Sequence, residues 1–76
     1  MRAMNGIVEQ IALSVNGEPM RVAFGLTVAE LVALLELDTR KVAVERNLEI
    51  VPRSTYGIVR LEDGDRLEIV HFIGGG

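Results

Sequence analysis

One stretch of this chain has the hydrophobic spacing of an α-helix, and strand-like alternating stretches lie on both sides of it. Its apolar residues recur at i, i+3, i+4 and i+7 and so share one helix face: Val28, Leu31, Val32 and Leu35. Thr27 precedes them and Glu30 stands three residues later, which is the arrangement of a capping box. The sequence therefore predicts a single amphipathic helix that begins after Thr27 and ends near Leu37.

The segment before the helix alternates between apolar and polar side chains, which predicts a β-hairpin. Its apolar positions are Ile11, Leu13 and Val15 in the first strand and Met20, Val22 and Phe24 in the second. Asn16-Gly17 lies between the two strands, and this pair suits the positive φ angles of a tight turn. Pro19 stands at the start of the second strand, where a missing N–H does least harm.

Further extended segments follow the helix. We expect a strand over residues 42–46, a turn near Asn47, a short piece over 49–51, an irregular connection in "RSTYG", and a final strand over 67–73 after an Asp63-Gly64 turn. This order predicts an α+β fold with one helix packed across a mixed sheet of four to five strands. The last strand is expected to pair in parallel beside the first, because a helical crossover returns to the same sheet.

Composition excludes several classes of function. At 76 residues the chain is one domain, and it contains no cysteine, so disulfides, thiolate catalysis and thiolate-bound zinc are excluded. The net charge of −3 and the absence of a basic patch interleaved with aromatics argue against nucleic-acid binding. No apolar run approaches the length of about 20 residues that spans a bilayer, and "MRAMNGIVEQ" lacks the apolar stretch of a signal peptide. We expect a cytoplasmic protein without a membrane segment.

No set of residues reads as an active site. His71 is the sole histidine and has no zinc-ligand spacing around it, so we expect a partly packed or hydrogen-bonded strand residue. Glu62, Asp63 and Asp65 surround one glycine, and we interpret them as a solvated turn, because calcium requires many more oxygen ligands. The sequence therefore predicts no catalytic residue, no metal site and no bound cofactor.

The last strand and the three glycines after it are the candidate functional region. Alternation places Val70 and Phe72 on the face opposite Leu67 and Ile69, so the first pair is expected to point outward as a surface for a partner. Gly74, Gly75 and Gly76 form a tail without side chains, thin enough to enter a narrow active site. We therefore expect one domain over residues 1–73 and a flexible glycine tail over 74–76.

Four segments of this sequence form a combined pattern over residues 11–76: "VNGEP", "LTVAELVALL", "VAVERNLEIVPRS" and "LEDGDRLEIVHFIGGG". Together they resemble the ThiS family of sulfur carrier proteins of thiamin biosynthesis. The resemblance implies a β-grasp, ubiquitin-like fold. Arg53 and Asp65 lie within these segments, and the sequence gives them no chemical role beyond turn structure.

The resemblance also implies a chemistry that takes place at Gly76. In this family an E1-like adenylyltransferase of the ThiF type uses ATP to adenylate the C-terminal glycine, and a persulfide derived from cysteine desulfurase displaces AMP. The resulting thiocarboxylate donates sulfur to a thiazole synthase of the ThiG type. Carried over, Gly76 holds the sulfur, Gly75 completes the glycine pair, and Val70 and Phe72 are the docking candidates. The chain would be a co-substrate of its partners and not an enzyme.

Three alternatives remain at this point. A molybdopterin-type sulfur carrier uses the same tail chemistry, but members of that family typically have prolines shortly before the tail, and "VHFIGGG" has none. A ubiquitin-like protein modifier would be attached to lysines, and Lys41 is the one lysine of this chain. A passive β-grasp binding module would not need the glycines.

Overall fold

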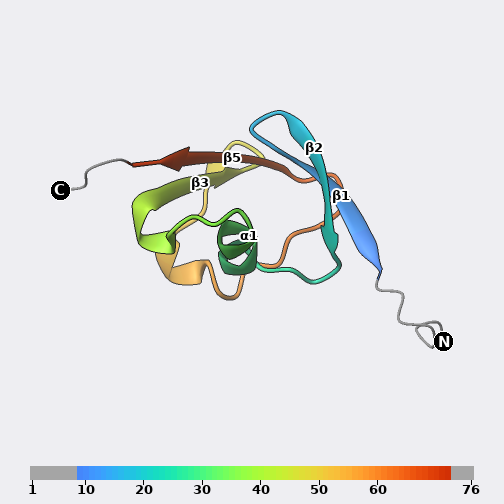
Figure 1. Ribbon diagram of the computed structural model, residues 1–76, viewed down its shortest axis with the longest axis horizontal. Helices are drawn as coiled ribbons and strands as arrows, with labels where there is room; N and C mark the ends of the chain where they lie inside the picture. The colour runs from blue at the N-terminus through green and yellow to red at the C-terminus, as the bar shows by residue number, and fades with distance from the viewer. Residues whose placement is uncertain (1–8, 73–76) are drawn as a thin grey trace.

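The computed structural model describes residues 9–72, and this part of the chain holds five strands and one α-helix (Figure 1). The strands are β1 (Gln10–Val15), β2 (Glu18–Ala23), β3 (Val42–Arg46), β4 (Glu49–Ile50) and β5 (Arg66–His71). The helix is α1 (Val28–Leu34), and two 3-10 turns are η2 (Thr39–Lys41) and η3 (Arg53–Thr55). The predicted α+β architecture is therefore confirmed, with five strands in one mixed sheet.

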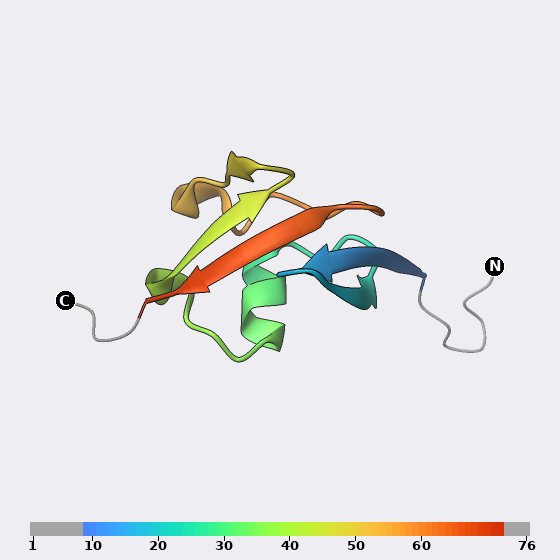
Figure 2. The same cartoon turned by 90° about the horizontal axis from the view of Figure 1, so that it is seen from above.

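The last strand of the sequence lies in the middle of the sheet. The strand order is β2-β1-β5-β3-β4, so β5 separates the β1–β2 hairpin from the β3–β4 hairpin. It runs parallel to β1, as expected, and it also pairs antiparallel with β3. β1 begins at one end of the molecule and β5 finishes at the other (Figure 2).

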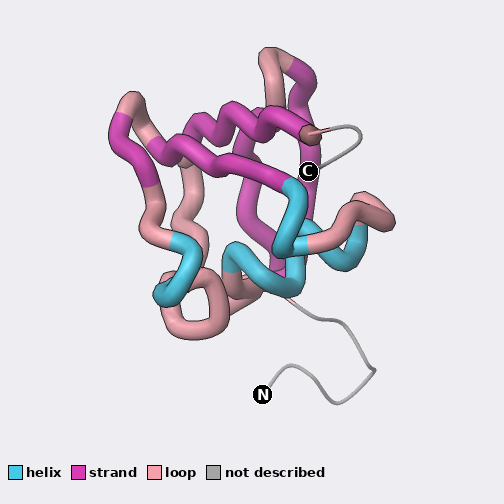
Figure 3. Tube along the Cα trace, turned by 90° about the vertical axis from the view of Figure 1, so that its left-hand side faces the viewer, coloured by secondary structure: helices cyan, strands magenta, loops and turns pink. Residues whose placement is uncertain are grey.

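One face of the sheet is covered by α1, and the core lies between them (Figure 3). The side chains that α1 buries are Val28, Leu31 and Val32, and they pack with the inward-facing residues of four strands: Ile11, Leu13, Val22, Val42, Val44, Leu67 and Ile69. The capping box is confirmed, because Thr27 Oγ1 accepts from the Glu30 N–H and Glu30 Oε1 accepts from the Thr27 N–H. This cap fixes where α1 begins.

The predicted end of the helix near Leu37 is wrong, because α1 ends at Leu34. Glu36 adopts the left-handed conformation with φ of 63°, a region that favours glycine. The Glu36 N–H donates to Ala33 O at 2.9 Å and the Leu37 N–H donates to Val32 O at 3.0 Å. These two bonds form a Schellman motif. The sequence did not indicate this helix end, because position 36 is a glutamate and not the glycine that is usual there.

Smaller differences lie at the ends of other elements. The second strand stops at Ala23, so Phe24 is exposed and is not a core residue. The segment 49–51 is a strand only over Glu49–Ile50, and part of "RSTYG" forms η3. The final strand begins at Arg66 instead of Leu67, and residue 73, its predicted end, lies outside the described residues.

Candidate functional site

The exposed end of β5 carries the two predicted docking residues. Val70 is 59% exposed and Phe72 is 43% exposed, whereas Leu67 and Ile69 of the same strand are buried in the core. Val70 lies opposite Ala43 of β3 on the sheet face away from α1. The outward direction predicted for Val70 from alternation is therefore observed, and two exposed apolar side chains lie at the point where β5 leaves the core.

The two sides of this strand end are held differently. On the β3 side, Val70 and His71 pair with Ala43 and Val42, and the Phe72 N–H donates to Lys41 O at 2.8 Å. On the β1 side, the ladder pairs Ser14 with Arg66 and Val15 with Leu67, and β1 then ends.

Beyond Val15 the side chain of Asn16 continues the contact with β5. Asn16 Oδ1 accepts from the Ile69 N–H at 2.8 Å, and Asn16 Nδ2 donates to Ile69 O at 3.1 Å. The sequence identified Asn16 as a turn residue alone. Its contact with a strand 53 positions later leaves no local signal in the sequence.

The other end of β5 begins in a buried polar network around Asp65. This carboxylate is 5% exposed and accepts from Arg46 Nε at 2.8 Å, Asn47 Nδ2 at 3.0 Å and the Glu62 N–H at 2.8 Å. The prediction of a solvated acidic turn is therefore wrong for Asp65. The alternation of β5 extends one step upstream and turns this carboxylate inward, where it joins the β3–β4 turn to the start of β5.

Two opposing effects act on the pKa of Asp65. Burial alone raises the pKa of this carboxyl group, because it removes the charged form from water. The hydrogen bonds from the Glu62 N–H, the Asn47 amide and the Arg46 guanidinium together outweigh burial, so the pKa is lowered from its ordinary value of 3.8. Asp65 is therefore ionised at neutral pH and structural in character.

Arg53 and His71 differ in their surroundings. Arg53 donates to Thr39 O at 3.1 Å and to Val42 O at 2.9 Å, so it ties η3 to the start of β3. His71 is exposed, so the expectation that it is partly packed is wrong, because the buried part of β5 ends at Ile69. Its side chain makes no hydrogen bond with another residue in the range 9–72.

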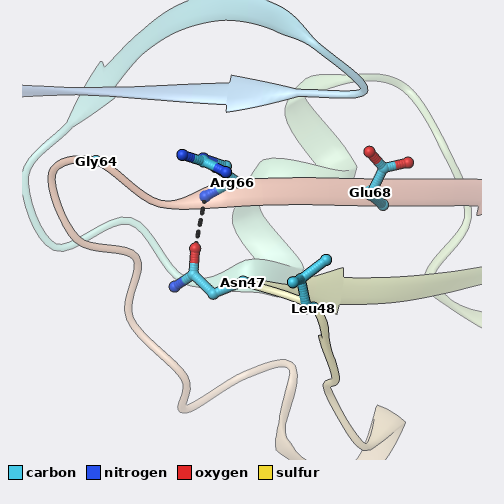
Figure 4. Close-up of a pocket in the computed structure, with 5 residues that line it drawn as sticks. All are labelled: Asn47, Leu48, Gly64, Arg66 and Glu68. Carbon is cyan, nitrogen blue, oxygen red and sulfur yellow. Dashed lines mark hydrogen bonds between the residues drawn. The ribbon is translucent and has the colours of Figure 1, made fainter.

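A shallow depression of about 450 Å³ lies on the outer face near the start of β5 (Figure 4). Its lining residues are Asn47, Leu48, Gly64, Arg66 and Glu68, and Asn47 Oδ1 accepts from the Arg66 N–H at 2.9 Å. These side chains do not pair a nucleophile with a base. Within residues 9–72 no three histidine or acidic side chains converge so as to hold a metal ion.

Two predicted features cannot be placed in this architecture. Gly74, Gly75 and Gly76 lie outside the described residues, and so does the boundary drawn between residues 73 and 74.

None of the described helices has the length and apolar character that crossing a membrane requires.

Comparison with known proteins follows the same segments. The sequence profile of the ThiS family matches residues 13–76, which include β5 and the glycines that follow it. This chain belongs to the ThiS family. A solved member, the thiamine biosynthesis protein ThiS from Geobacter metallireducens, is 38% identical and superposes with a TM-score of 0.74. That alignment covers 87% of this chain and 100% of the other.

Relatives in the ThiS family occur as small proteins and as parts of longer ones. The sulfur carrier protein ThiS of Bacillus subtilis is 48% identical over 50 residues, which are 66% of this chain and 76% of that protein. A thiazole synthase of Paramagnetospirillum magneticum is 58% identical over 64 residues, and one of Magnetococcus marinus is 48% identical over 64. Each alignment covers 84% of this chain but only 20% of the thiazole synthase, so this chain spans about a fifth of the length of these relatives.

Proposed function

We propose that this chain is the sulfur carrier of thiamin biosynthesis and that the carboxyl group of Gly76 carries the sulfur. The observation that supports this most strongly is the match to the ThiS family over residues 13–76, because it continues through the glycine pair and does not stop at the fold. The relative from Bacillus subtilis, which bears the name sulfur carrier protein ThiS, supports the same conclusion.

The proposed chemistry has three steps on the carboxyl group of Gly76. A carboxylate is an anion at neutral pH and a poor electrophile, so an E1-like adenylyltransferase first joins it to the α-phosphate of ATP and releases pyrophosphate. The outer sulfur of a persulfide, formed by a cysteine desulfurase, then attacks the acyl carbon and AMP leaves. Reduction of the resulting S–S bond by a thiol leaves the thiocarboxylate.

The described residues would contribute docking and not chemistry. Val70 and Phe72 are exposed apolar side chains that precede the glycine tail in the sequence, and a few residues near the centre of an interface commonly carry most of its binding energy. We propose that they contact the partner enzymes, while the core under α1 acts as a rigid handle. The chain is then a co-substrate, has no bound cofactor, and acts in the cytoplasm where ATP is available.

The receiving partner is proposed to be thiazole synthase. Two thiazole synthases contain a region 58% and 48% identical to this chain, so in those proteins the two parts belong to one polypeptide. A carrier domain tethered to its acceptor has a high effective concentration there. This favours delivery of sulfur to thiazole formation over delivery to a pterin.

Intact mass measurement of the untagged protein from its native host tests the proposal. Under thiamin starvation we expect a species heavier by the difference between one sulfur and one oxygen atom, with fragmentation locating the change at Gly76. Deletion of Gly76 should abolish this species without changing the melting temperature. A peptide link between Gly76 and a lysine of another protein would instead support a protein modifier.

Deletion of the gene separates the two carrier pathways. A thiamin requirement that added thiazole relieves would support the proposal. Loss of molybdenum-cofactor enzymes with normal growth in the absence of thiamin would contradict it.

A further inference from the structure

Asn16 occupies the place that a strand residue would take beside the end of β5. The β1–β5 ladder is short, with pairs only at Ser14 and Val15, because the chain turns back into β2 at Asn16-Gly17. β5 continues to His71. Without another partner, the N–H and C=O of Ile69 on the β1 side would have no hydrogen bond, while β3 still paired with the neighbouring residues of the strand.

The Asn16 amide supplies that support with the donor and acceptor of a peptide group. The Asn16 main-chain N–H donates to Leu67 O at 2.8 Å, and its side chain then accepts from the Ile69 N–H at 2.8 Å and donates to Ile69 O at 3.1 Å. Only this orientation of the amide satisfies both groups, since the reverse would oppose two donors and two acceptors. Asn16 reaches β5 from a left-handed conformation with φ of 52°, which asparagine tolerates better than most residues.

The position of this contact along β5 is informative. Ile69 is the last core residue of the strand, and Val70, His71 and Phe72 after it are exposed. The Asn16 amide therefore holds β5 on the boundary between its buried part and the part proposed to meet the partner. A strand end held on both sides at this boundary retains less conformational freedom before binding than one held by β3 alone.

We propose that Asn16 is a positioning residue for sulfur transfer. This inference rests on the proposed carrier function and adds a residue that lies outside the docking pair and the glycines. By fixing Ile69 from the β1 side, Asn16 sets the direction in which residues 70–72 continue along β3 beyond the end of β1. The partner then binds a strand end that is already ordered, so less of the binding free energy is consumed in ordering it.

The test uses two variants of Asn16 and a matched variant at the start of β5. Asn16→Gly keeps a residue that accepts positive φ and removes the amide, and Asn16→Asp keeps the acceptor for the Ile69 N–H but loses the donor to Ile69 O. Asn47→Gly makes the same chemical change in the other asparagine turn, where φ is 53° and the amide bonds to Asp65 and Arg66. It weakens the fold without touching the end of β5.

Each protein is converted to its thiocarboxylate and titrated into the thiazole synthase of the same organism. We expect Asn16→Gly to raise the KM for the carrier about three- to tenfold, the effect of losing one or two neutral hydrogen bonds, with kcat nearly unchanged. Asn16→Asp should behave similarly, and Asn47→Gly should keep the wild-type KM. Amide hydrogen exchange at Ile69 should become faster in Asn16→Gly, which removes the acceptor of this N–H, and stay slow in Asn47→Gly.

The outcomes separate this inference from the proposed function. An unchanged KM in both Asn16 variants would overturn the positioning role, and so would an equal rise in Asn47→Gly, because loss of stability alone would then explain it. If the wild-type chain itself accepted no sulfur at Gly76, the carrier function would fall and this role would fall with it.

Discussion

Each end of β5 is bonded to an asparagine that stands in a turn with positive φ, Asn47 at the start and Asn16 at the end, but the surroundings of the two asparagines differ. At the start of the strand, Asn47 belongs to a network with buried Asp65 and Arg46. At its end, the side chain of Asn16 bonds to the main chain of Ile69, and exposed Val70 and Phe72 follow. The start of the strand adjoins a buried carboxylate whose hydrogen bonds are made, and the end of the strand carries exposed apolar side chains.

We propose that this difference separates stability from recognition within residues 65–72. Changes near Asp65 should lower the free energy of unfolding, because they leave buried polar groups without partners. Changes at Val70 and Phe72 should mainly alter association, because exposed apolar side chains contribute little to the fold. The following experiments test that separation, beginning with the largest expected effect.

Replacing Asp65 by alanine should produce the largest loss of stability. The variant leaves Arg46, Asn47 and the Glu62 N–H without their shared acceptor, and we expect a loss of about 3 kcal/mol in urea unfolding. Asp63→Ala is the matched control, since exposed Asp63 accepts one bond from the Ala12 N–H at 2.8 Å, and it should cost about 1 kcal/mol. A smaller loss in Asp65→Ala than in the control would contradict the buried network.

Acid should remove part of the same contribution. The pKa of Asp65 is lowered in the folded state, so its stabilising effect is complete above the ordinary value of 3.8 and is lost as the pH falls through the folded pKa. The difference in free energy of unfolding between the wild type and Asp65→Asn should be largest near neutral pH and shrink well below pH 3.8. A difference independent of pH would show that the charge of Asp65 does not matter.

At the other end of β5, Phe72→Ala should weaken association with thiazole synthase about tenfold, which corresponds to about 1.4 kcal/mol, and Val70→Ala should act in the same direction. Both variants should lose less than about 0.5 kcal/mol of stability. Isothermal titration calorimetry and urea unfolding measure the two quantities. Ile58→Ala removes another exposed aliphatic side chain and should leave association unchanged. Equal weakening by Ile58→Ala would contradict a specific role for the end of β5.

The smallest effect is expected from the residues that follow the two asparagines. Gly17 has φ of 84° and Leu48 has φ of 72°, so a leucine that is 88% exposed occupies a conformation that favours glycine. Leu48→Gly should raise stability by about 0.5 kcal/mol, because relief of strain exceeds the added freedom of the unfolded chain. Gly17→Leu should lower it by about 1 kcal/mol, since a Cβ at Gly17 meets no atom within 4 Å and the cost is conformational. Melting temperatures of both variants test the pair.

Local patterns made most of the fold predictable. The alternation around Asn16-Gly17, the capping box of Thr27 and Glu30 and the strand over residues 42–46 depend on neighbours in sequence, and the structure confirms them. The end of α1 could not be predicted, because a glutamate stands where a helix normally ends in glycine.

The polar contacts that organise the candidate site depend on register, which the sequence does not display. Asp65 meets Asn47 across 18 positions, and Asn16 meets Ile69 across 53. Considered alone, "LEDGD" resembles a solvated turn, and only the inward alternation of β5 shows that its last carboxylate is buried. The outward direction of Val70 was predictable, because a period of two needs only one buried neighbour as reference.

The central position of β5 has a consequence for how the molecule is made. The two hairpins do not pair with each other, since β5 lies between them, so each lacks a neighbouring strand until this last segment arrives. Pairing between distant parts of a chain is slow, because loop-closure entropy is lost before the contacts form. During synthesis the sheet therefore cannot close before residues 66–71 have left the ribosome. The pairing of β5 that completes the sheet also places Val70 on the exposed face.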